Sequence, residues 1–280
     1  MAYDHTIDID QAQTFLTQHL GAEPAAITHV GEGAWSRCYG FAVDGQELVI
    51  RFGQYVSDFR KDQRAHAYTG PDLPVPEVLE IGRALGGYYA ISTRVTGIPL
   101  ETVSAAQWLR LVPAVAAALE AMRTADLSTT TGYGGWDAAG HAPYPDWRTR
   151  LLSVAEDRPD QRGHGWHAAL ATCAEGQATF DWGLSLLDRV ADEGVPRSLV
   201  HGDLTNRNVL VADDQINGVF DWGCSIYGDH LYDLACFEFW APWQPTLDTQ
   251  GLRAALEQRW AQQGYRPANQ EARLAACHLH

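Results

Sequence analysis

The sequence predicts an α+β protein with two parts, a sheet-rich N-terminal part over residues 1–96 and a mainly helical part over residues 97–280. Three observations predict this class. Short β-prone runs joined by tight-turn signals fill residues 27–96, helical periodicity dominates from residue 104 onward, and the 280-residue chain is 46% hydrophobic against 20% charged. That composition is typical of a folded globular protein, and a chain of this length can bury a large core.

The N-terminal part begins with a predicted helix and continues as an antiparallel sheet. Residues 9–20 space their apolar side chains at helical intervals, and Gly21 follows them as a C-cap glycine would. Asp44-Gly45 lies between two β-prone runs and predicts a two-residue hairpin turn. Gly86-Gly87 predicts the tip of another hairpin, and the charged segment 58–70 between the hairpins is compatible with a helix.

The second part reads as helices separated by loops. A helix is predicted over residues 104–123, which Pro113 would kink or divide. Further helices are predicted near residues 147–155 and over residues 166–191. The rest of residues 126–165 is rich in Gly, Pro, Thr and Asp, which predicts surface loops of a length that is often functional.

The charge balance limits the partners of the protein. The chain carries 20 Lys and Arg residues against 35 Asp and Glu residues, a formal charge of −15 at pH 7, so it would repel the phosphates of a nucleic acid. We therefore expect no nucleic-acid partner. The same excess of carboxylates favours a small cationic acceptor that carries several amines.

Cysteine spacing and hydropathy bear on the compartment. The five cysteines lie far apart without a C-x-x-C pair, which argues against a disulfide framework and a zinc cluster. The first residues show no basic region followed by an apolar run, and no run of about 18 apolar residues occurs. We expect a monomer in the cytoplasm, with no membrane partner.

Two carboxylates and an amide between β-rich runs form the most informative pattern. His201-Gly-Asp203 follows a short β-prone run, Asn208 comes five residues after Asp203, and Asp221 comes thirteen residues after Asn208. Phosphoryl transfer needs these groups: a carboxylate that orients an attacking hydroxyl, and oxygen ligands for Mg²⁺. A polar hairpin with solvated turns explains any one of these residues alone, whereas all three at these spacings favour a phosphoryl-transfer site.

These motifs resemble those of the aminoglycoside phosphotransferase and choline kinase family of small-molecule kinases. The resemblance rests on H-G-D at 201–203, D-W at 221–222 and G-D-x-x-x-D-L-A from Gly228, and it extends along nearly the whole chain. It implies a bilobal protein-kinase-like fold, with a nucleotide-binding lobe over residues 1–96 and the catalytic loop in residues 97–280. It also implies Mg²⁺ as cofactor and ATP or GTP as phosphoryl donor.

The resemblance assigns roles to individual residues. Asp203 is implied to be the catalytic carboxylate, with His201 bracing the catalytic loop, while Asn208 and Asp221 hold Mg²⁺. The residues implied in nucleotide binding are Gly31, Gly33 and Ser36 of a glycine-rich loop with Trp35 at its tip, Arg51 in place of the phosphate-binding lysine of protein kinases, and Thr93, Arg94 and Val95 of the hinge.

The helix after Arg51 lacks the glutamate that protein kinases place opposite the phosphate-binding residue. Asp58 and Asp62 are the available carboxylates, and Lys61 is another possible phosphate contact. The alternative for these three residues is a solvated helix face, which is the more common location of such charges.

Acidic and aromatic residues are the candidates for the acceptor pocket, because ammonium groups pair with carboxylates and sugar faces stack on aromatic rings. The candidates are Asp126, Asp229, Glu238 and Trp240, followed by Asp137, Asp146, Trp147 and Trp243. A structural role is preferred for Asp229 and Asp233, which can bond the loop backbone or cap the helix that begins near His230. Because the family continues beyond the point where this chain ends, we expect part of the pocket to be missing.

The expected function is phosphorylation of an aminoglycoside hydroxyl, with hygromycin B as the leading acceptor and antibiotic resistance as the physiological role. One alternative is a kinase of another small alcohol, such as choline, an amino sugar or a macrolide. The other is a silent nucleotide-binding module, although such a module would have no need for Asp203, Asn208 and Asp221 together.

Overall fold

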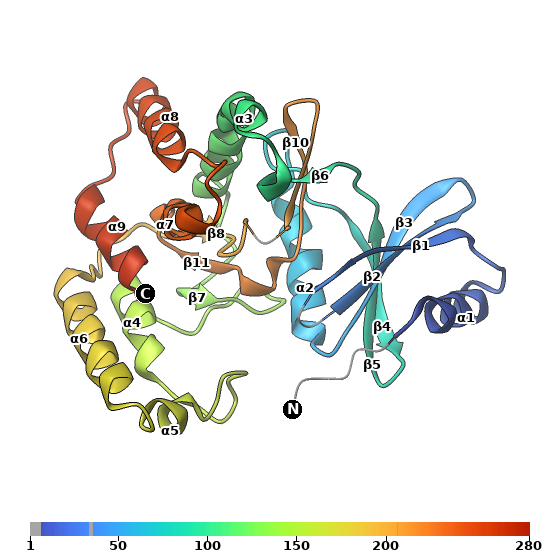
Figure 1. Cartoon of the computed structure of the whole chain (residues 1–280), viewed down its shortest axis with the longest axis horizontal. Helices are drawn as coiled ribbons and strands as arrows, with labels where there is room; N and C mark the ends of the chain where they lie inside the picture. Colours follow the sequence, from blue (N-terminus) through green and yellow to red (C-terminus); the bar gives the residue numbers. More distant parts are fainter. Residues whose placement is uncertain (1–6, 34–35, 206) are drawn as a thin grey trace. The chain divides into compact units, whose positions relative to one another are not determined.

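A computed structural model describes residues 7–33, 36–205 and 207–280 of the chain (Figure 1). Trp35 of the glycine-rich loop lies outside the described residues. The chain forms two compact units, which we call unit 1 (Met1–Ala121 and Asn206–Cys224) and unit 2 (Met122–Thr205 and Ser225–His280). Unit 1 extends beyond the expected boundary at residue 96, since it also holds most of the next helix and the hairpin that follows the catalytic loop.

Unit 1 is built on a five-stranded antiparallel sheet with the strand order β1-β2-β3-β5-β4. Asp44 and Gly45 both have positive φ, as a two-residue hairpin turn requires, which confirms the first predicted hairpin. The second turn lies at Leu85-Gly86, one residue before the predicted tip, because Gly87 already pairs with Ala84. The strands are β1 (Ala25–Glu32), β2 (Ser36–Val43), β3 (Gln46–Gly53), β4 (Val78–Ala84) and β5 (Gly87–Thr93).

One helix packs on each face of this sheet (Figure 1). Helix α1 (Ile9–Leu20) has a capping box between Asp8 and Gln11 and ends at Gly21 with φ 70°, as predicted. It buries Leu16 in a core with alternate residues of β2, β3 and β5. Helix α2 (Val56–Ala65), followed by a 3₁₀ turn (His66–Tyr68), buries Phe59 against the opposite face.

The segment that follows the hinge is hydrogen-bonded to a hairpin within unit 1. Strand β6 (Ile98–Pro99) pairs with β9 (Val209–Ala212), and β9 pairs with β10 (Gln215–Val219). Gly97 lies so close to β9 that a Cβ atom on it would be 2.7 Å from the Val211 carbonyl oxygen. The side chain of Asn217 also donates to the carbonyl oxygen of Thr96. The hairpin that has Asn208 and Asp221 at its two ends is therefore fixed to the chain segment directly after the hinge.

Helix α3 (Ala105–Arg123) follows a short 3₁₀ turn (Leu100–Thr102) and is not divided by Pro113. Pro113 is exposed, whereas its neighbours Val112 and Val115 are buried, so packing along one side of the helix continues past the proline. The Ser104 hydroxyl accepts a hydrogen bond from the backbone N–H of Gln107 and caps the first turn.

Unit 2 combines a small sheet, of order β7-β11-β8, with helices. The helix predicted over residues 166–191 is interrupted near residue 172 and forms α5 and α6. Trp147 is buried, and its ring contacts Gly228 so closely that no larger residue fits there. The elements are β7 (Gly134–Gly135), α4 (Trp147–Leu152), α5 (Trp166–Leu170), α6 (Ala174–Val190), β8 (Ser198–Val200), β11 (Ile226–Gly228), α7 (Leu231–Trp240), α8 (Thr249–Gln262) and α9 (Gln270–Leu279), with 3₁₀ turns at Ser153–Ala155 and Ala241–Trp243.

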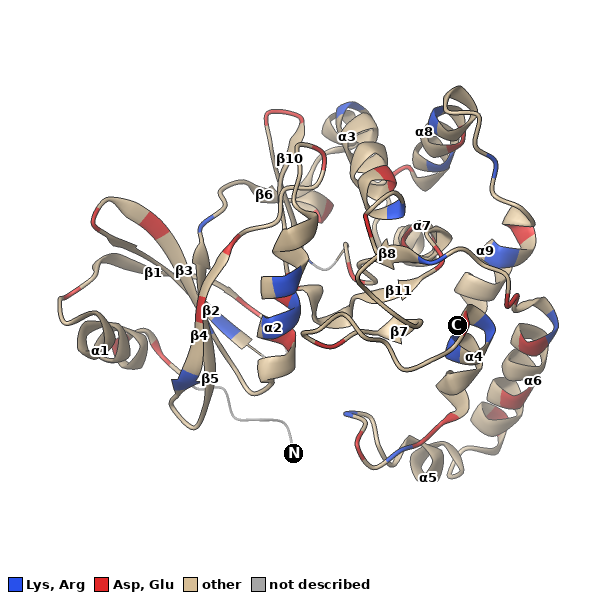
Figure 2. Ribbon diagram, turned by 180° about the vertical axis from the view of Figure 1, so that it is seen from behind, with Lys and Arg blue, Asp and Glu red and all other residues tan. Residues whose placement is uncertain are grey.

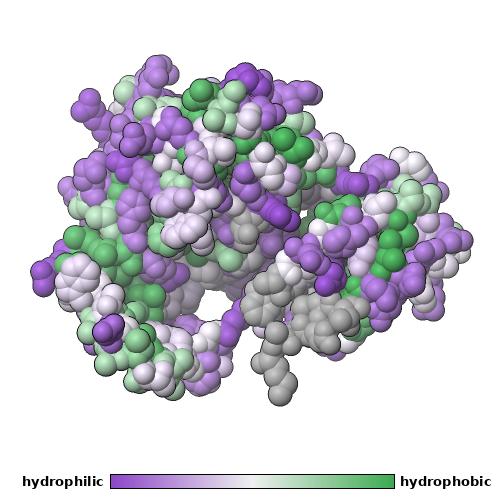
Figure 3. All heavy atoms as spheres, in the orientation of Figure 1, coloured by the Kyte–Doolittle hydropathy of each residue, from purple (hydrophilic) through white to green (hydrophobic). Residues whose placement is uncertain are grey.

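The predicted α+β class is confirmed by an antiparallel N-terminal sheet and a mainly helical remainder. On the face drawn in Figure 3, hydrophilic and hydrophobic residues are intermixed. None of the helices in the described part of the chain is both long and apolar enough to cross a bilayer.

We expect Gly97→Ala to lower the free energy of unfolding by about 1–3 kcal/mol, because it combines an unfavourable φ with a clash against β9. Gly97 has φ 150° and has the Val211 carbonyl oxygen in contact distance. Gly70→Ala is the matched control, since φ there is not positive and no atom lies within 4 Å of the added Cβ. Urea unfolding of both variants checks the prediction, and equal stability would contradict it.

Candidate active site

The catalytic loop of unit 2 begins directly after β8. His201 is fully buried, and its Nδ1 accepts a hydrogen bond of 3.2 Å from the backbone N–H of Asp203. Gly202 has φ 80°, a conformation that favours glycine, and Asp203 is only half-buried. The His201 ring thus braces the backbone on which Asp203 is carried, as the resemblance implies.

Asp233 of α7 holds the same loop from the other side. Its two carboxylate oxygens accept hydrogen bonds from the backbone N–H groups of His201 (2.9 Å) and Gly202 (2.7 Å). Burial raises the pKa of Asp233 to about 6, which the two N–H donors oppose and the charge of Asp203 reinforces. The structural role predicted for Asp233 is confirmed.

Asp229 is also structural. Its carboxylate forms a two-pronged pair with the Arg273 guanidinium (2.6 and 2.8 Å) and accepts the backbone N–H of Leu231 (3.0 Å) at the start of α7. The side chains of Asp229 and Arg273 are 0% and 4% exposed. This arrangement fits the structural role preferred for Asp229 rather than its candidacy for the acceptor pocket, because its carboxylate is out of solvent and already satisfied.

Arg51 lies in a network of charges in unit 1. Its guanidinium pairs with Asp62 of α2, and another guanidinium nitrogen lies 3.2 Å from a carboxylate oxygen of Asp221. The central guanidinium carbon lies 4.7 Å from the centroid of the Phe59 ring. Burial opposes the charged form, but the carboxylates of Asp62 and Asp221 outweigh it and raise the pKa of Arg51. Arg51 is therefore charged and held with its planar group in one orientation.

Of the two carboxylates available on this helix, Asp62 is paired with Arg51. One of its oxygens pairs with Arg51, and the other accepts the backbone N–H of Trp222 at 2.7 Å. The Lys61 ammonium donates to the Gly223 carbonyl oxygen at 2.9 Å. The alternative of a solvated helix face is thus wrong for Asp62 and Lys61, although charged residues mark α2 clearly (Figure 2).

The residues expected to bind Mg²⁺ lie at the two ends of the β9–β10 hairpin. Asn208 is buried, and its carbonyl oxygen accepts the N–H of Phe220 at 3.0 Å, which holds the two ends together. Asp221 has φ 61°, and its side chain is 44% exposed. Among the described residues, no three His, Cys, Asp or Glu side chains form a metal cluster. Mg²⁺ usually takes one or two protein ligands beside phosphate oxygens and waters, so the Asn208 and Asp221 oxygens fit it.

The described part of the glycine-rich loop closes through a hydrogen bond from the Gly33 N–H to the Ser36 carbonyl oxygen (2.9 Å). A Cβ on Gly31 would meet no atom within 4 Å, and one on Gly33 would meet only the Ser36 hydroxyl at 3.8 Å. The packing of the chain itself therefore does not require glycine at Gly31 or Gly33. Close approach of a bound group to the backbone explains them better.

In two of the three hinge residues the backbone N–H group already donates a hydrogen bond within the protein. Thr93 and Arg94 donate their N–H groups to the carbonyl oxygens of Glu77 and Glu47 (3.0 and 3.2 Å). These two N–H groups are therefore already engaged within unit 1, and nucleotide contacts of Thr93 and Arg94 stay a prediction. Val95 is the hinge residue on which base recognition would depend, and its side chain packs on Gly218.

The acidic residues expected in the acceptor pocket are mostly engaged in the fold. Glu238 pairs with Arg253 (2.7 Å) and His278 (2.9 Å), so its charge is largely neutralised. Asp126 is exposed and accepts the Ser128 N–H, which lowers its pKa. Of the further candidates, Asp137 and Asp146 accept backbone N–H groups in a turn and at the start of α4, and Trp147 belongs to the core.

Three exposed aromatic side chains form a cluster at the end of α7. The ring of Trp240 lies 5.2 Å from that of Phe239 and 5.6 Å from that of Trp243. They are 53% (Phe239), 45% (Trp240) and 66% (Trp243) exposed, which is unusual for three contacting aromatic residues. Of the three, Phe239 was missed as a site candidate, since an apolar residue in a helix reads as core.

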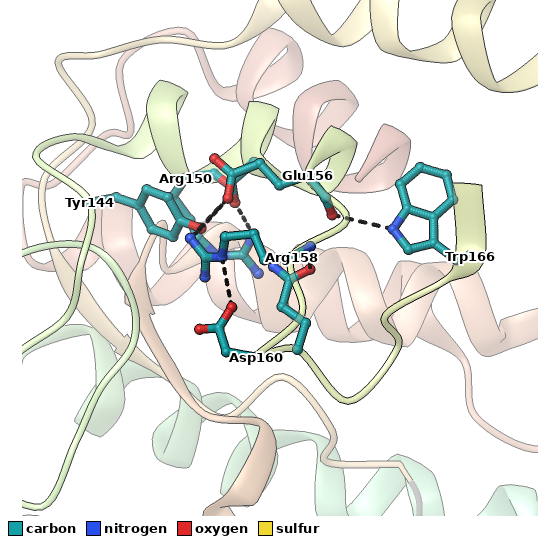
Figure 4. A network of polar contacts seen from close by, with 8 residues as sticks. Tyr144, Arg150, Glu156, Arg158, Asp160 and Trp166 are labelled. Atoms are coloured by element: carbon teal, nitrogen blue, oxygen red, sulfur yellow. Dashed lines mark hydrogen bonds and ion pairs between the residues drawn. The ribbon is translucent and has the colours of Figure 1, made fainter. Parts of the chain in front are cut away.

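The loop between α4 and α5 is ordered by a polar network (Figure 4). The Glu156 carboxylate accepts hydrogen bonds from the Tyr144 hydroxyl (3.3 Å) and the Arg158 guanidinium (2.9 Å), and its backbone carbonyl accepts the Trp166 indole N–H (3.2 Å). Arg158 also pairs with Asp160 at 3.4 Å. These contacts account for the polar residues of the loop without a ligand.

Comparisons with known proteins agree with these motifs. The profile of the phosphotransferase enzyme family matches residues 50–269. The chain is 30% identical to hygromycin-B 4-O-kinase of Escherichia coli over 229 residues, which cover 80% of this chain and 65% of that relative. The structure resembles a thermostable variant of aminoglycoside phosphotransferase APH(4)-Ia, in a ternary complex with AMP-PNP and hygromycin B, with a TM-score of 0.80 at 28% identity over 95% of this chain and 88% of that one.

A more distant structure shares only the fold. An aminoglycoside-3'-phosphotransferase of type VIII matches with a TM-score of 0.58 at 20% identity, over 96% of this chain and 97% of that one.

We expect Asp229→Asn to lower the free energy of unfolding by about 3–5 kcal/mol, because it leaves a buried guanidinium without its counter-charge. Glu47→Gln is the control, since it breaks the exposed pair with Arg94, which contributes at most about 1 kcal/mol. Chemical denaturation followed by circular dichroism measures both. Similar losses for the two variants would show that the Asp229–Arg273 pair does not stabilise unit 2.

The pKa of Asp233 predicts a pH-dependent stability term. The folded state raises this pKa from 3.8 to about 6, so it binds the proton more tightly than the unfolded state does. Proton binding by Asp233 therefore stabilises the folded state fully at a pH below 3.8, and this stabilisation is lost as the pH rises to about 6. The difference in unfolding free energy between wild type and Asp233→Asn should therefore fall over this interval. A difference that is constant with pH would refute the assignment.

Proposed function

Because the chain belongs to the phosphotransferase enzyme family, we propose that it transfers a phosphoryl group from a nucleoside triphosphate to a hydroxyl group of an aminoglycoside. The observation that carries the proposal is the catalytic loop, in which His201 and Asp233 hold the backbone around Asp203. The half-buried carboxylate of Asp203 is thus presented by a rigid support. The family relationship supplies the reaction class.

Asp203 acts on the acceptor. Its carboxylate accepts a hydrogen bond from the hydroxyl that attacks the phosphorus, orients it, and takes its proton as the new bond forms. Because the transition state is largely dissociative, orientation matters more than the basicity of Asp203. The rigid support therefore contributes directly to the rate.

Asn208, Asp221 and Arg51 act on the phosphates. Asn208 and Asp221 would hold Mg²⁺, which when bound neutralises phosphate charge. Arg51 is kept charged and planar by Asp62 and the Phe59 ring, so it can pair with a phosphate oxygen with little loss of side-chain freedom. Gly31 and Gly33 let the loop backbone come close to the phosphates.

The acceptor is an aminoglycoside, a sugar that carries several amino groups, and hygromycin B is the leading candidate. Both hygromycin relatives described above point to it, and the chain's charge of −15 favours a cationic molecule. The exposed rings of Phe239, Trp240 and Trp243 offer faces for the sugar, and the exposed Asp126 carboxylate offers a partner for an ammonium group. We expect the protein to act as a monomer in the cytoplasm, where phosphorylation would inactivate the antibiotic. ATP is the first donor to test, because the APH(4)-Ia variant described above is in a complex with AMP-PNP.

We expect Asp203→Asn to reduce turnover about 10²–10⁴-fold while nucleotide affinity stays unchanged, because the residue acts on the acceptor hydroxyl in the transition state. Asp213→Asn is the matched control, since Asp213 is an exposed turn residue with φ 48°, which asparagine tolerates. A coupled assay of ADP or GDP release measures turnover with hygromycin B, kanamycin, streptomycin, a macrolide and choline.

The assay also decides between acceptors. Turnover with an aminoglycoside that disappears in Asp203→Asn supports the proposal and names the substrate. Turnover only with choline or a macrolide moves the protein to another group of small-molecule kinases. Nucleotide binding without turnover on any acceptor would overturn the proposed activity.

A further inference from the structure

Arg207, the residue before Asn208, has an unfavourable backbone. Its φ is 62°, in the left-handed region that residues with a Cβ rarely adopt. Such a conformation persists only where surrounding contacts determine it. Because Arg207 directly precedes Asn208, a change of its φ would redirect the Asn208 side chain.

The side chain of Glu101 contacts this turn. Its carboxylate accepts a hydrogen bond from the backbone N–H of Arg207 and faces the positive charge of the same residue. Burial raises the pKa of Glu101, and the N–H donors and the Arg207 charge oppose that rise. Within the described residues its Oε2 is buried without a hydrogen-bond partner, so Glu101 is not an ordinary surface carboxylate.

The backbone of Glu101 is itself fixed to the hairpin that Asn208 begins. Ile98 and Pro99 of β6 pair with Val211 and Leu210 of β9, and Glu101 lies in the 3₁₀ turn that follows β6. Leu100 is fully buried beside it. The distance between Glu101 and the Arg207 turn is therefore set by β-pairing rather than by a flexible loop.

From these contacts we propose that Glu101 is a positioning residue that fixes the Arg207–Asn208 turn and thereby aims the Asn208 oxygen at Mg²⁺. The inference rests on the proposed role of Asn208 in metal binding. Residues that orient a metal ligand contribute strongly to affinity, and their loss typically weakens metal binding about 10–100-fold.

The test compares Mn²⁺ binding to wild type, Glu101→Ala and Glu101→Gln in the presence of AMP-PNP, by electron paramagnetic resonance. We expect the Mn²⁺ dissociation constant to rise about tenfold or more in Glu101→Ala. Glu101→Gln should lose much less, because the amide oxygen still accepts the Arg207 N–H. Glu175→Ala, an exposed glutamate at the start of α6, is the control and should bind as wild type does.

Glycine at residue 207 separates positioning from general stability. Glycine adopts positive φ without strain, so Glu101→Ala combined with Arg207→Gly should recover most of the Mn²⁺ affinity lost in Glu101→Ala. A merely structural role for Glu101 would lower the melting temperature without changing Mn²⁺ affinity, and glycine at residue 207 would restore nothing. That outcome would overturn the inference.

Failure of the proposed function gives a different result. If wild type binds no Mn²⁺ with nucleotide present, the metal role of Asn208 is wrong, and the inference about Glu101 falls with it. If wild type binds Mn²⁺ and Glu101→Ala binds it equally well, the metal role stands and only the positioning role is overturned. The Mg²⁺ concentration for half-maximal turnover provides a second readout, since it should rise in Glu101→Ala while turnover at saturating Mg²⁺ changes little.

Discussion

The buried carboxylate of Asp62 is the constraint that fixes the surroundings of Arg51 and Asp221 in unit 1. It joins three elements of unit 1, because it lies on α2, pairs with Arg51 of β3 and accepts the N–H of Trp222 beside Asp221. Without that carboxylate, the buried Arg51 guanidinium would lose its paired acid and would depend more on Asp221, which lies 3.2 Å away.

A buried aspartate also fixes the backbone in unit 2. Asp233 accepts the backbone N–H groups of His201 and Gly202, as Asp62 accepts that of Trp222. In each unit a buried aspartate fixes the backbone next to an aspartate to which the proposed function gives a role, Asp221 in unit 1 and Asp203 in unit 2. Backbone hydrogen bonds suit this task, since they set position without competing for the reactive oxygen atoms.

The sequence was sufficient where the information is local and insufficient where it is long-range. Helix α1 and the Asp44-Gly45 turn follow from short patterns that neighbouring residues complete. The motif around Asp203 was found from residue types and their spacing together with the family resemblance. Asp229 stood among the acceptor candidates without its arginine partner, and Glu101 was missed. In both cases the partner is distant in sequence, and a lone acidic residue does not indicate which arginine or N–H group it will meet.

The uneven exposure of the tryptophans has a practical consequence. The chain has ten, and Trp108, Trp136, Trp147 and Trp222 are fully buried, whereas Trp240 and Trp243 are exposed at the end of α7. Buried indoles emit at short wavelength and are insensitive to soluble quenchers, while exposed ones emit further to the red. Trp182 of α6 is exposed as well, so the red-shifted emission comes from Trp182 and the aromatic cluster together. A molecule that covers the rings of the cluster would change the cluster's share of this emission, without any attached label.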